Sequence, residues 1–120
     1  MTVEKRFEYK GYPCVIIFHT YDEELLSHGL YLENYLCGYV GLPKTSKFYK
    51  KNYDDIPIDC HGGLTYGSNQ LFGQNDPDTF WIGYDCAHYG DSIFICNLEY
   101  CEEQCRSIVD QIIEAESVKE

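Results

Sequence analysis

Basic side chains are scarce in this 120-residue sequence, which holds 9 lysines and arginines against 20 aspartates and glutamates. The formal net charge is -11. A chain this acidic repels the phosphate backbone of nucleic acids and anionic membrane surfaces. We therefore expect no direct binding to nucleic acid or to a membrane, and the expected partner is a basic protein or a cation.

Long apolar runs are also missing. No stretch approaches the roughly 20 residues of a membrane-spanning helix, and residues 1–10 are charged where a secretory signal is apolar. These absences predict a cytoplasmic protein, in a compartment that disfavours disulfides. The seven cysteines are then expected as metal ligands or buried thiols. The length predicts a single domain over residues 1–120.

Recognised catalytic signatures are absent as well. The sequence has no Cys-x-x-Cys pair, no His-Glu-x-x-His, no phosphate-binding Gly-Lys loop, no Gly-x-Ser-x-Gly and no zinc-deaminase pattern. We therefore expect a protein that is not an enzyme. The alternative is a small zinc-dependent hydrolase acting on a nucleotide or similar anion, with a zinc-bound water beside Asp85 or Asp91.

Hydrophobic periodicity predicts the elements of the fold. Apolar side chains over residues 98–115 recur at helical spacing and predict a long amphipathic C-terminal helix. Residues 14–19, 35–42 and 80–85 are predicted strands, and residues 54–66 are predicted as a strand broken by a bulge. The expected fold class is α+β, with a mainly antiparallel sheet covered by the C-terminal helix.

Two short segments carry the densest functional signal, residues 61–66 (HGGLTY) and residues 83–91 (GYDCAHYGD). Thiolate and imidazole are preferred zinc ligands, and a Cys-x-His triplet after a strand can aim both side chains at one point. We predict a structural zinc held by His61, Cys86 and His88. The fourth ligand stays open among several side chains: Asp91, Asp85, Cys60, Cys37 and Cys105.

The same residues also have interpretations that involve no metal. Cys86 and His88 can equally be a buried thiol and a hydrogen-bonded histidine. The remaining cysteines of apolar runs and of the helix are expected to pack in the core, because a free cysteine behaves as a small hydrophobe. That group contains four residues: Cys14, Cys96, Cys101 and Cys105.

The two segments together resemble a group of small bacteriophage proteins that share HGG-x-T-Y and G-x-D-C-A-H-x-G-D, a likeness that extends from Cys37 to Asp91. The small acidic format is similar to that of anti-CRISPR proteins, including zinc-containing inhibitors of the type II effector Cas9. The resemblance implies a phage-encoded protein of the host cytoplasm that binds Cas9 without catalysis and blocks its engagement of target DNA. It implies His61, Cys86 and His88 as metal ligands.

The charge pattern suggests a surface for such binding. Cas9 holds its heteroduplex in a positively charged channel, and an acidic surface can compete for it. Much of the excess negative charge lies between residues 97 and 120. The alternative is that the acidic side chains form only a solvated face. The predicted partner-binding residues lie along the helix: Glu99, Glu102, Glu103, Asp110 and Glu114.

Overall fold

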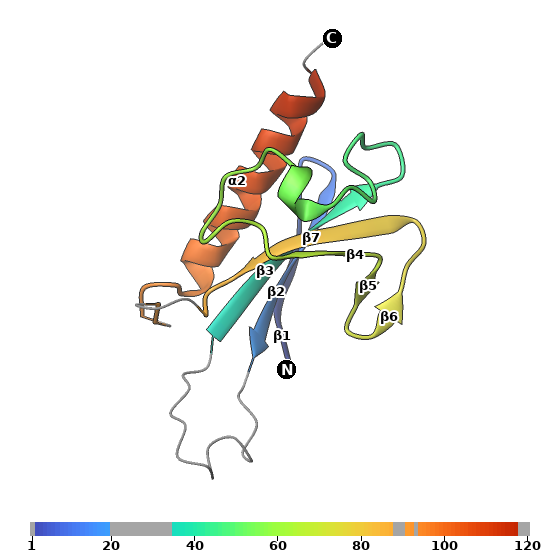
Figure 1. The fold of residues 1–120 in the computed structure, drawn as a ribbon. Helices are drawn as coiled ribbons and strands as arrows, with labels where there is room; N and C mark the ends of the chain where they lie inside the picture. The colour runs from blue at the N-terminus through green and yellow to red at the C-terminus, as the bar shows by residue number, and fades with distance from the viewer. Residues whose placement is uncertain (1, 20–34, 88–90, 93, 118–120) are drawn as a thin grey trace.

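The computed structural model describes residues 2–19, 35–87, 91–92 and 94–117. These residues form a 5-stranded antiparallel sheet in the order β1-β2-β3-β7-β4, a separate two-stranded pair β5-β6, and one long helix, α2 (Figure 1). The architecture confirms the predicted α+β class. The elements are β1 (Thr2–Tyr9), β2 (Tyr12–His19), β3 (Tyr35–Pro43), the 3-10 helix η1 (Tyr53–Asp55), β4 (Tyr66–Ser68), β5 (Gln70–Leu71), β6 (Gln74–Asn75), β7 (Thr79–Asp85) and α2 (Leu98–Ser117).

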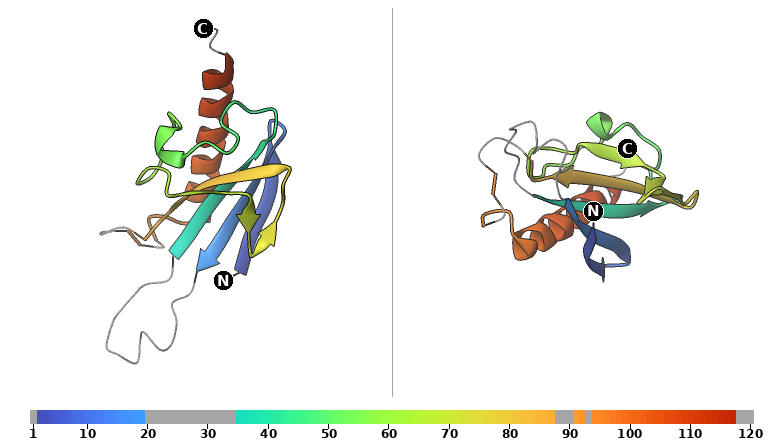
Figure 2. Two further views of the ribbon diagram at one scale, coloured as in Figure 1. Left: turned by 45° about the vertical axis from the view of Figure 1, so that its right-hand side comes forward. Right: turned by 90° about the horizontal axis from the view of Figure 1, so that it is seen from below.

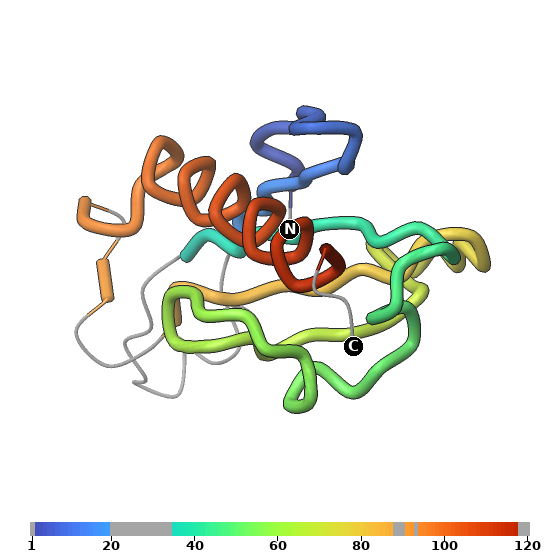
Figure 3. Tube along the Cα trace, turned by 90° about the horizontal axis from the view of Figure 1, so that it is seen from above, coloured from blue at the N-terminus to red at the C-terminus, as the bar shows by residue number. Residues whose placement is uncertain are grey.

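Helix α2 covers one face of the sheet, as Figure 3 shows from above. Its buried residues are Cys101, Cys105, Ile108, Val109 and Ile112, which recur at the spacing predicted for its apolar stripe. They pack against alternate residues of the central strands, because successive strand side chains point to opposite faces. No helix in the described part of the chain is both long and apolar enough to cross a membrane.

The opposite face of the sheet carries a second, smaller apolar cluster. Val15, Ile17, Cys37 and Tyr39 are buried there. The β5-β6 pair lies on this side, away from α2 (Figure 2), and its Leu71 and Phe72 pack against the cluster together with Tyr66 and Trp81. The sheet is therefore covered on one side by α2 together with the segment that carries Phe48 and Ile56, and partly on the other side by a short hairpin.

The N-terminal strand β1 is not predicted by the sequence patterns, because half of its side chains are charged. It pairs with β2 from Thr2↔Phe18 to Tyr9↔Tyr12, and the hairpin turns at Lys10 and Gly11, whose φ angles are 51° and 87°. Two successive residues with positive φ are the requirement of a tight hairpin turn. Charged side chains are suited to the edge of a sheet, where they oppose pairing with other chains.

The prediction of a broken strand over residues 54–66 was wrong, since only Tyr66 of this range lies in a strand. The segment instead crosses towards α2, and glutamine side chains of the helix satisfy its backbone. Gln111 accepts a hydrogen bond from the N–H of Asp59 at 2.7 Å and donates one to its carbonyl at 2.7 Å. These contacts replace the ladder of a strand and bring Asp59 alongside the helix.

Candidate metal centre

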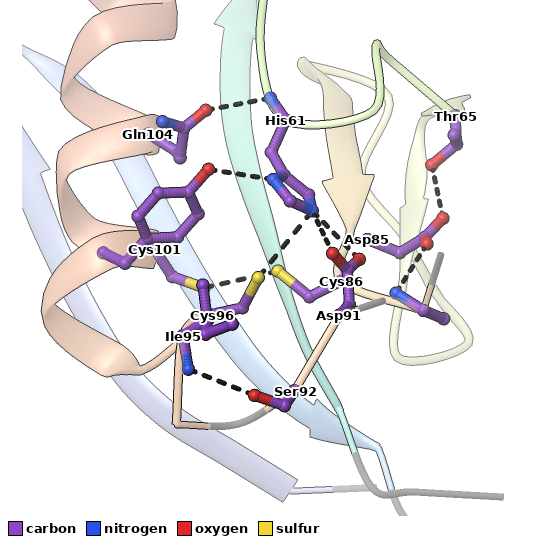
Figure 4. A network of polar contacts seen from close by, with 12 residues as sticks. His61, Thr65, Asp85, Cys86, Asp91, Ser92, Ile95, Cys96, Cys101 and Gln104 are labelled. Atoms are coloured by element: carbon purple, nitrogen blue, oxygen red, sulfur yellow. Dashed lines mark hydrogen bonds and ion pairs between the residues drawn. The ribbon is translucent and has the colours of Figure 1, made fainter. Parts of the chain in front are cut away.

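Three segments of the chain bring a histidine and two cysteines together near the start of α2. The ligand atoms of His61, Cys86 and Cys96 all lie within 4.8 Å of one another, so these residues could hold a metal ion. We call this group the thiol–imidazole cluster. In Figure 4 the ring of His61 points from its loop towards the sulfur atoms of Cys86 and Cys96, and α2 runs beside it.

His61 is held in place from both its backbone and its ring. Its N–H donates to Gln104 Oε1 at 2.9 Å, and its Nδ1 lies 2.8 Å from the hydroxyl oxygen of Tyr100. The next two residues, Gly62 and Gly63, have φ angles of 68° and 79°, which only glycine adopts at low cost. The chain therefore turns sharply after His61, and Nε2 is the ring nitrogen that faces the sulfur atoms.

The two cysteines are fixed by backbone hydrogen bonds at the ends of their segments. Cys86 directly follows β7, and its N–H donates to the carbonyl of Leu36 at 3.0 Å. Cys96 closes a turn in which its N–H donates to the carbonyl of Ser92 at 2.7 Å. Both thiols are buried, with exposures of 4% and 1%. The cluster thus joins the sheet to the segment that leads into α2.

One pair of atoms in the cluster has the spacing of ligands on a tetrahedral zinc. With Zn–S near 2.3 Å and Zn–N near 2.0–2.1 Å, the edges of a tetrahedron are about 3.6 Å for sulfur to nitrogen and about 3.8 Å for sulfur to sulfur. Cys96 Sγ lies 3.7 Å from His61 Nε2. Cys86 Sγ lies 3.9 Å from the Sγ of Cys101 on α2. Cys101 is therefore placed as a possible fourth ligand beside Cys86.

Asp91 lies on the opposite side of the cluster from Cys101. Its carboxylate oxygens are 2.9 and 3.0 Å from His61 Nε2, and both side chains are mostly buried, with exposures of 19% for His61 and 12% for Asp91. A metal on Nε2 would lie within reach of this carboxylate. Asp91 thus contacts the cluster at His61 and Cys101 contacts it at Cys86, but the group whose ligand atoms all lie within 4.8 Å of one another contains neither of them.

The other predicted candidates lie elsewhere. Asp85 follows Tyr84 on β7 and points to the opposite face of the sheet, where Thr65 donates to it at 3.0 Å. Cys37 belongs to the apolar cluster on that same face. Cys105 hydrogen-bonds to Cys14 deeper in the core. Cys60 is next to His61 but does not belong to the cluster, and His88 lies outside the described residues.

The thiols of the cluster are weak acids in this environment. Hydrogen bonding to Cys101 and burial raise the pKa of Cys86 well above its usual range, and burial raises the pKa of Cys96. A thiol in such surroundings is a poor nucleophile at neutral pH, because the thiolate is the reactive form. A metal ion would have to displace the protons of both thiols, which links its affinity to pH.

Cys96 is the residue that sequence reasoning missed, because its apolar neighbours made it look like a core cysteine. It precedes Asn97, whose side chain accepts a hydrogen bond from the N–H of Tyr100 at 2.9 Å as the N-cap of α2. The position of Cys96 between residues 83–91 and the start of the helix is the sequence signal that could have identified it as a member of the cluster.

Cavities of about 300 to 490 Å³ are lined by described residues outside the cluster, and none of His61, Cys86 and Cys96 lines these cavities. Comparison with protein-family models, with curated proteins and with solved structures finds no match to this chain. The resemblance to phage proteins and to Cas9 inhibitors therefore stays a prediction.

Proposed function

We propose that this protein is a binding domain stabilised by a structural zinc, and that it acts by occluding a basic protein partner and not by catalysis. The observation that carries the proposal is the thiol–imidazole cluster, which lies buried between the sheet and the start of α2. Structural zinc sites are closed, whereas catalytic sites keep an open position for water. A buried set of two thiols and one imidazole fits the first class.

Zinc is the metal that suits this donor set. Soft thiolate ligands select zinc over the hard cations magnesium and calcium, which take oxygen ligands. The contact of His61 Nδ1 with Tyr100 fits the pattern in which a metal-bound histidine donates its other N–H to a neighbouring oxygen. Bound zinc would then tie the loop, the end of β7 and the helix into one unit.

The two residues that precede Cys96 of the cluster present apolar side chains to solvent. Phe94 is 90% exposed and Ile95 is 64% exposed, and they directly precede the buried Cys96. Large exposed apolar side chains are typical of binding surfaces, and aromatic residues are enriched at the energetic centres of interfaces. We propose that Phe94 and Ile95, held by the metal site, form an apolar contact point for the partner.

An acidic helix face begins next to this contact point. Glu99, Glu103, Asp110 and Glu114 are exposed and fall within an arc of about 60° on α2. The remaining predicted residue, Glu102, is turned towards β1 and pairs with Lys5. Asp110 pairs with Lys10 at 2.8 Å. The charge available to a basic partner is therefore concentrated at Glu99, Glu103 and Glu114.

Cas9 is the partner that the sequence resemblance implies, and a DNA-cleavage assay tests it. We expect excess protein to suppress cleavage of target DNA by a guide-loaded Cas9. Glu103→Lys and Phe94→Ser should each weaken the inhibition, whereas Glu8→Lys, the same charge change on an exposed residue of β1, should leave it unchanged. Normal cleavage at saturating protein would contradict Cas9 as the partner.

Elemental analysis tests the zinc. Purified protein should contain zinc near one equivalent, and Cys96→Ser should lose it. Cys14→Ser is the matched control, because Cys14 is equally buried at 1% exposure and lies outside the cluster. Absence of zinc from the unmodified protein would refute the site. Nucleotide hydrolysis by zinc-loaded protein, abolished by Asp91→Asn without unfolding, would support the hydrolase alternative instead.

A further inference from the structure

A cavity of about 490 Å³ opens on the face of the sheet that α2 does not cover. Its lining comes from β2, β3, β4 and the β5-β6 hairpin. A cavity of this volume is within the range of small-ligand sites and can take one long side chain of a partner. We call it the aromatic pocket, and its lining residues are Ile17, His19, Tyr39, Tyr66, Leu71, Phe72 and Gly73.

Aromatic rings form much of this lining. The rings of Tyr39 and Tyr66 meet edge to face, with centroids 5.3 Å apart and planes at 82°, and Phe72 contributes a third ring from the hairpin. Ring faces carry partial negative charge and attract cations within about 6 Å. A pocket lined by several rings set at angles to one another is suited to a cation.

One polar atom of the pocket lacks a partner. His19 Nε2 is buried and has no hydrogen-bond partner among the described residues, although its ring stacks on Tyr35 with centroids 5.1 Å apart. Burial lowers the pKa of His19, so the ring is neutral near pH 7 and one of its nitrogens is an acceptor. A ligand N–H would satisfy this atom after the His19 ring turns towards the pocket, since the atom has no accessible surface in the structure.

The charge around the pocket favours a cation. No lysine or arginine lines it. Two charges act on His19 in opposite directions: the N-terminal ammonium has the larger effect and disfavours the charged ring, whereas the carboxylate of Asp85, which pairs in register with Cys37 on the same face of the sheet, favours it. The whole chain carries a net charge of -11. An anionic ligand is therefore disfavoured, and a ligand that brings both positive charge and N–H donors is favoured.

We propose that the aromatic pocket binds the guanidinium group of an arginine from a basic partner protein. The guanidinium stacks against Tyr39 and Tyr66, and it donates one N–H to His19 Nε2 when the His19 ring turns to face the pocket. Arginine fits better than lysine, because its planar group stacks on rings, carries a fork of donors and is more weakly hydrated than an ammonium. The inference rests on the proposed function for the identity of the partner, and it deepens that function by naming the group recognised.

The test is an NMR titration of isotope-labelled protein with a short capped peptide, acetyl-Gly-Arg-Gly-amide. The matched probe replaces arginine by citrulline, which keeps the shape and removes the charge. We expect resonances of His19, Tyr39 and Tyr66 to shift with the arginine peptide, and the citrulline peptide to bind at least about fivefold more weakly. Equal binding of the two peptides, or shifts confined to α2, would overturn the proposal.

Two variants locate the interaction. His19→Phe keeps the ring that stacks on Tyr35 and removes the acceptor, and Tyr66→Leu removes one face of the pocket; each should weaken arginine-peptide binding severalfold. Tyr53→Leu is the control, because Tyr53 lies in η1 and lines none of the pocket. Should a variant fail to fold, the arginine and citrulline comparison on unmodified protein still decides the matter.

The outcome is separable from that of the Cas9 assay. Arginine-specific binding in the pocket combined with normal Cas9 cleavage would retain the pocket and reject Cas9 as the partner. Suppressed cleavage combined with equal binding of arginine and citrulline peptides would retain the inhibitor function and reject the pocket.

Discussion

Gly38 on β3 leaves room for the ring of Tyr84 on the neighbouring strand β7. An added Cβ at this position would lie 2.5 Å from Tyr84 Cε1 and 2.6 Å from its hydroxyl oxygen, about 1 Å inside an ordinary carbon contact. The ring cannot easily withdraw, because Tyr84 is 1% exposed and its hydroxyl donates to the carbonyl of Cys101 at 3.0 Å. Gly38→Ala is therefore expected to be strongly destabilising.

The magnitude follows from two contributions. Overpacking of a closed core costs about 1–3 kcal/mol, and loss of the hydrogen bond from Tyr84 to Cys101 costs about 1 kcal/mol more. We expect Gly38→Ala to lower the free energy of unfolding by about 2–4 kcal/mol. Zinc affinity should fall as well, because Cys101 lies beside Cys86 of the thiol–imidazole cluster.

Urea denaturation followed by circular dichroism measures the change. Gly67→Ala is the matched control, because its Cβ would meet Phe80 at 3.1 Å, and its cost should be about 1 kcal/mol or less. The double variant Gly38→Ala/Tyr84→Leu should cost at least about 1 kcal/mol less than the sum of the two single variants. A loss below about 1 kcal/mol for Gly38→Ala, or simple additivity in the double variant, would refute the argument.

Four further predictions concern metal, core, pH and surface. A chelator should lower the free energy of unfolding by about 2.7 kcal/mol relative to protein held at a free zinc concentration 100 times Kd, and this difference should vanish in Cys96→Ser. Ile108→Ala, at a fully buried position of α2, should cost about 2–5 kcal/mol in the same denaturation assay. Burial raises the pKa of Cys37 to about 12 from 9.0. Between pH 9 and pH 12 the folded thiol therefore keeps its proton while the unfolded thiol ionises, and the free energy of unfolding should fall by up to about 1.4 kcal/mol per pH unit. The fall should be less steep in Cys37→Ala. Lys10→Ala breaks only an exposed ion pair with Asp110 and should leave the unfolding midpoint unchanged, since such pairs contribute little.

The spacing of apolar side chains was sufficient to predict the helix and the strands whose own residues repeat with a helical or a strand period. The apolar stripe of α2 predicts its buried residues, and strands β2, β3 and β7 appear within a residue or two of their predicted ranges. The same spacing gave wrong or missing predictions where the hydrogen-bond partners of a segment lie in a distant part of the chain. Strand β1 is charged and forms because β2 offers it a partner. Residues 54–66 alternate like a strand, but glutamines of α2 bind the backbone N–H groups of Asp59 and His61.

The sequence by itself determined that the chain is one acidic domain of the α+β class, and it drew attention to His61, Cys86, His88 and Asp91 through their glycine-flanked segments. Only the tertiary structure decided which other thiols join them. Cys96 and Cys101 share the same chemistry and the same apolar setting as Cys14 and Cys105, yet only the former pair lies next to Cys86 or His61. Proximity of sulfur atoms depends on sheet register and on where the helix begins. Neither is encoded in the local period of the side chains.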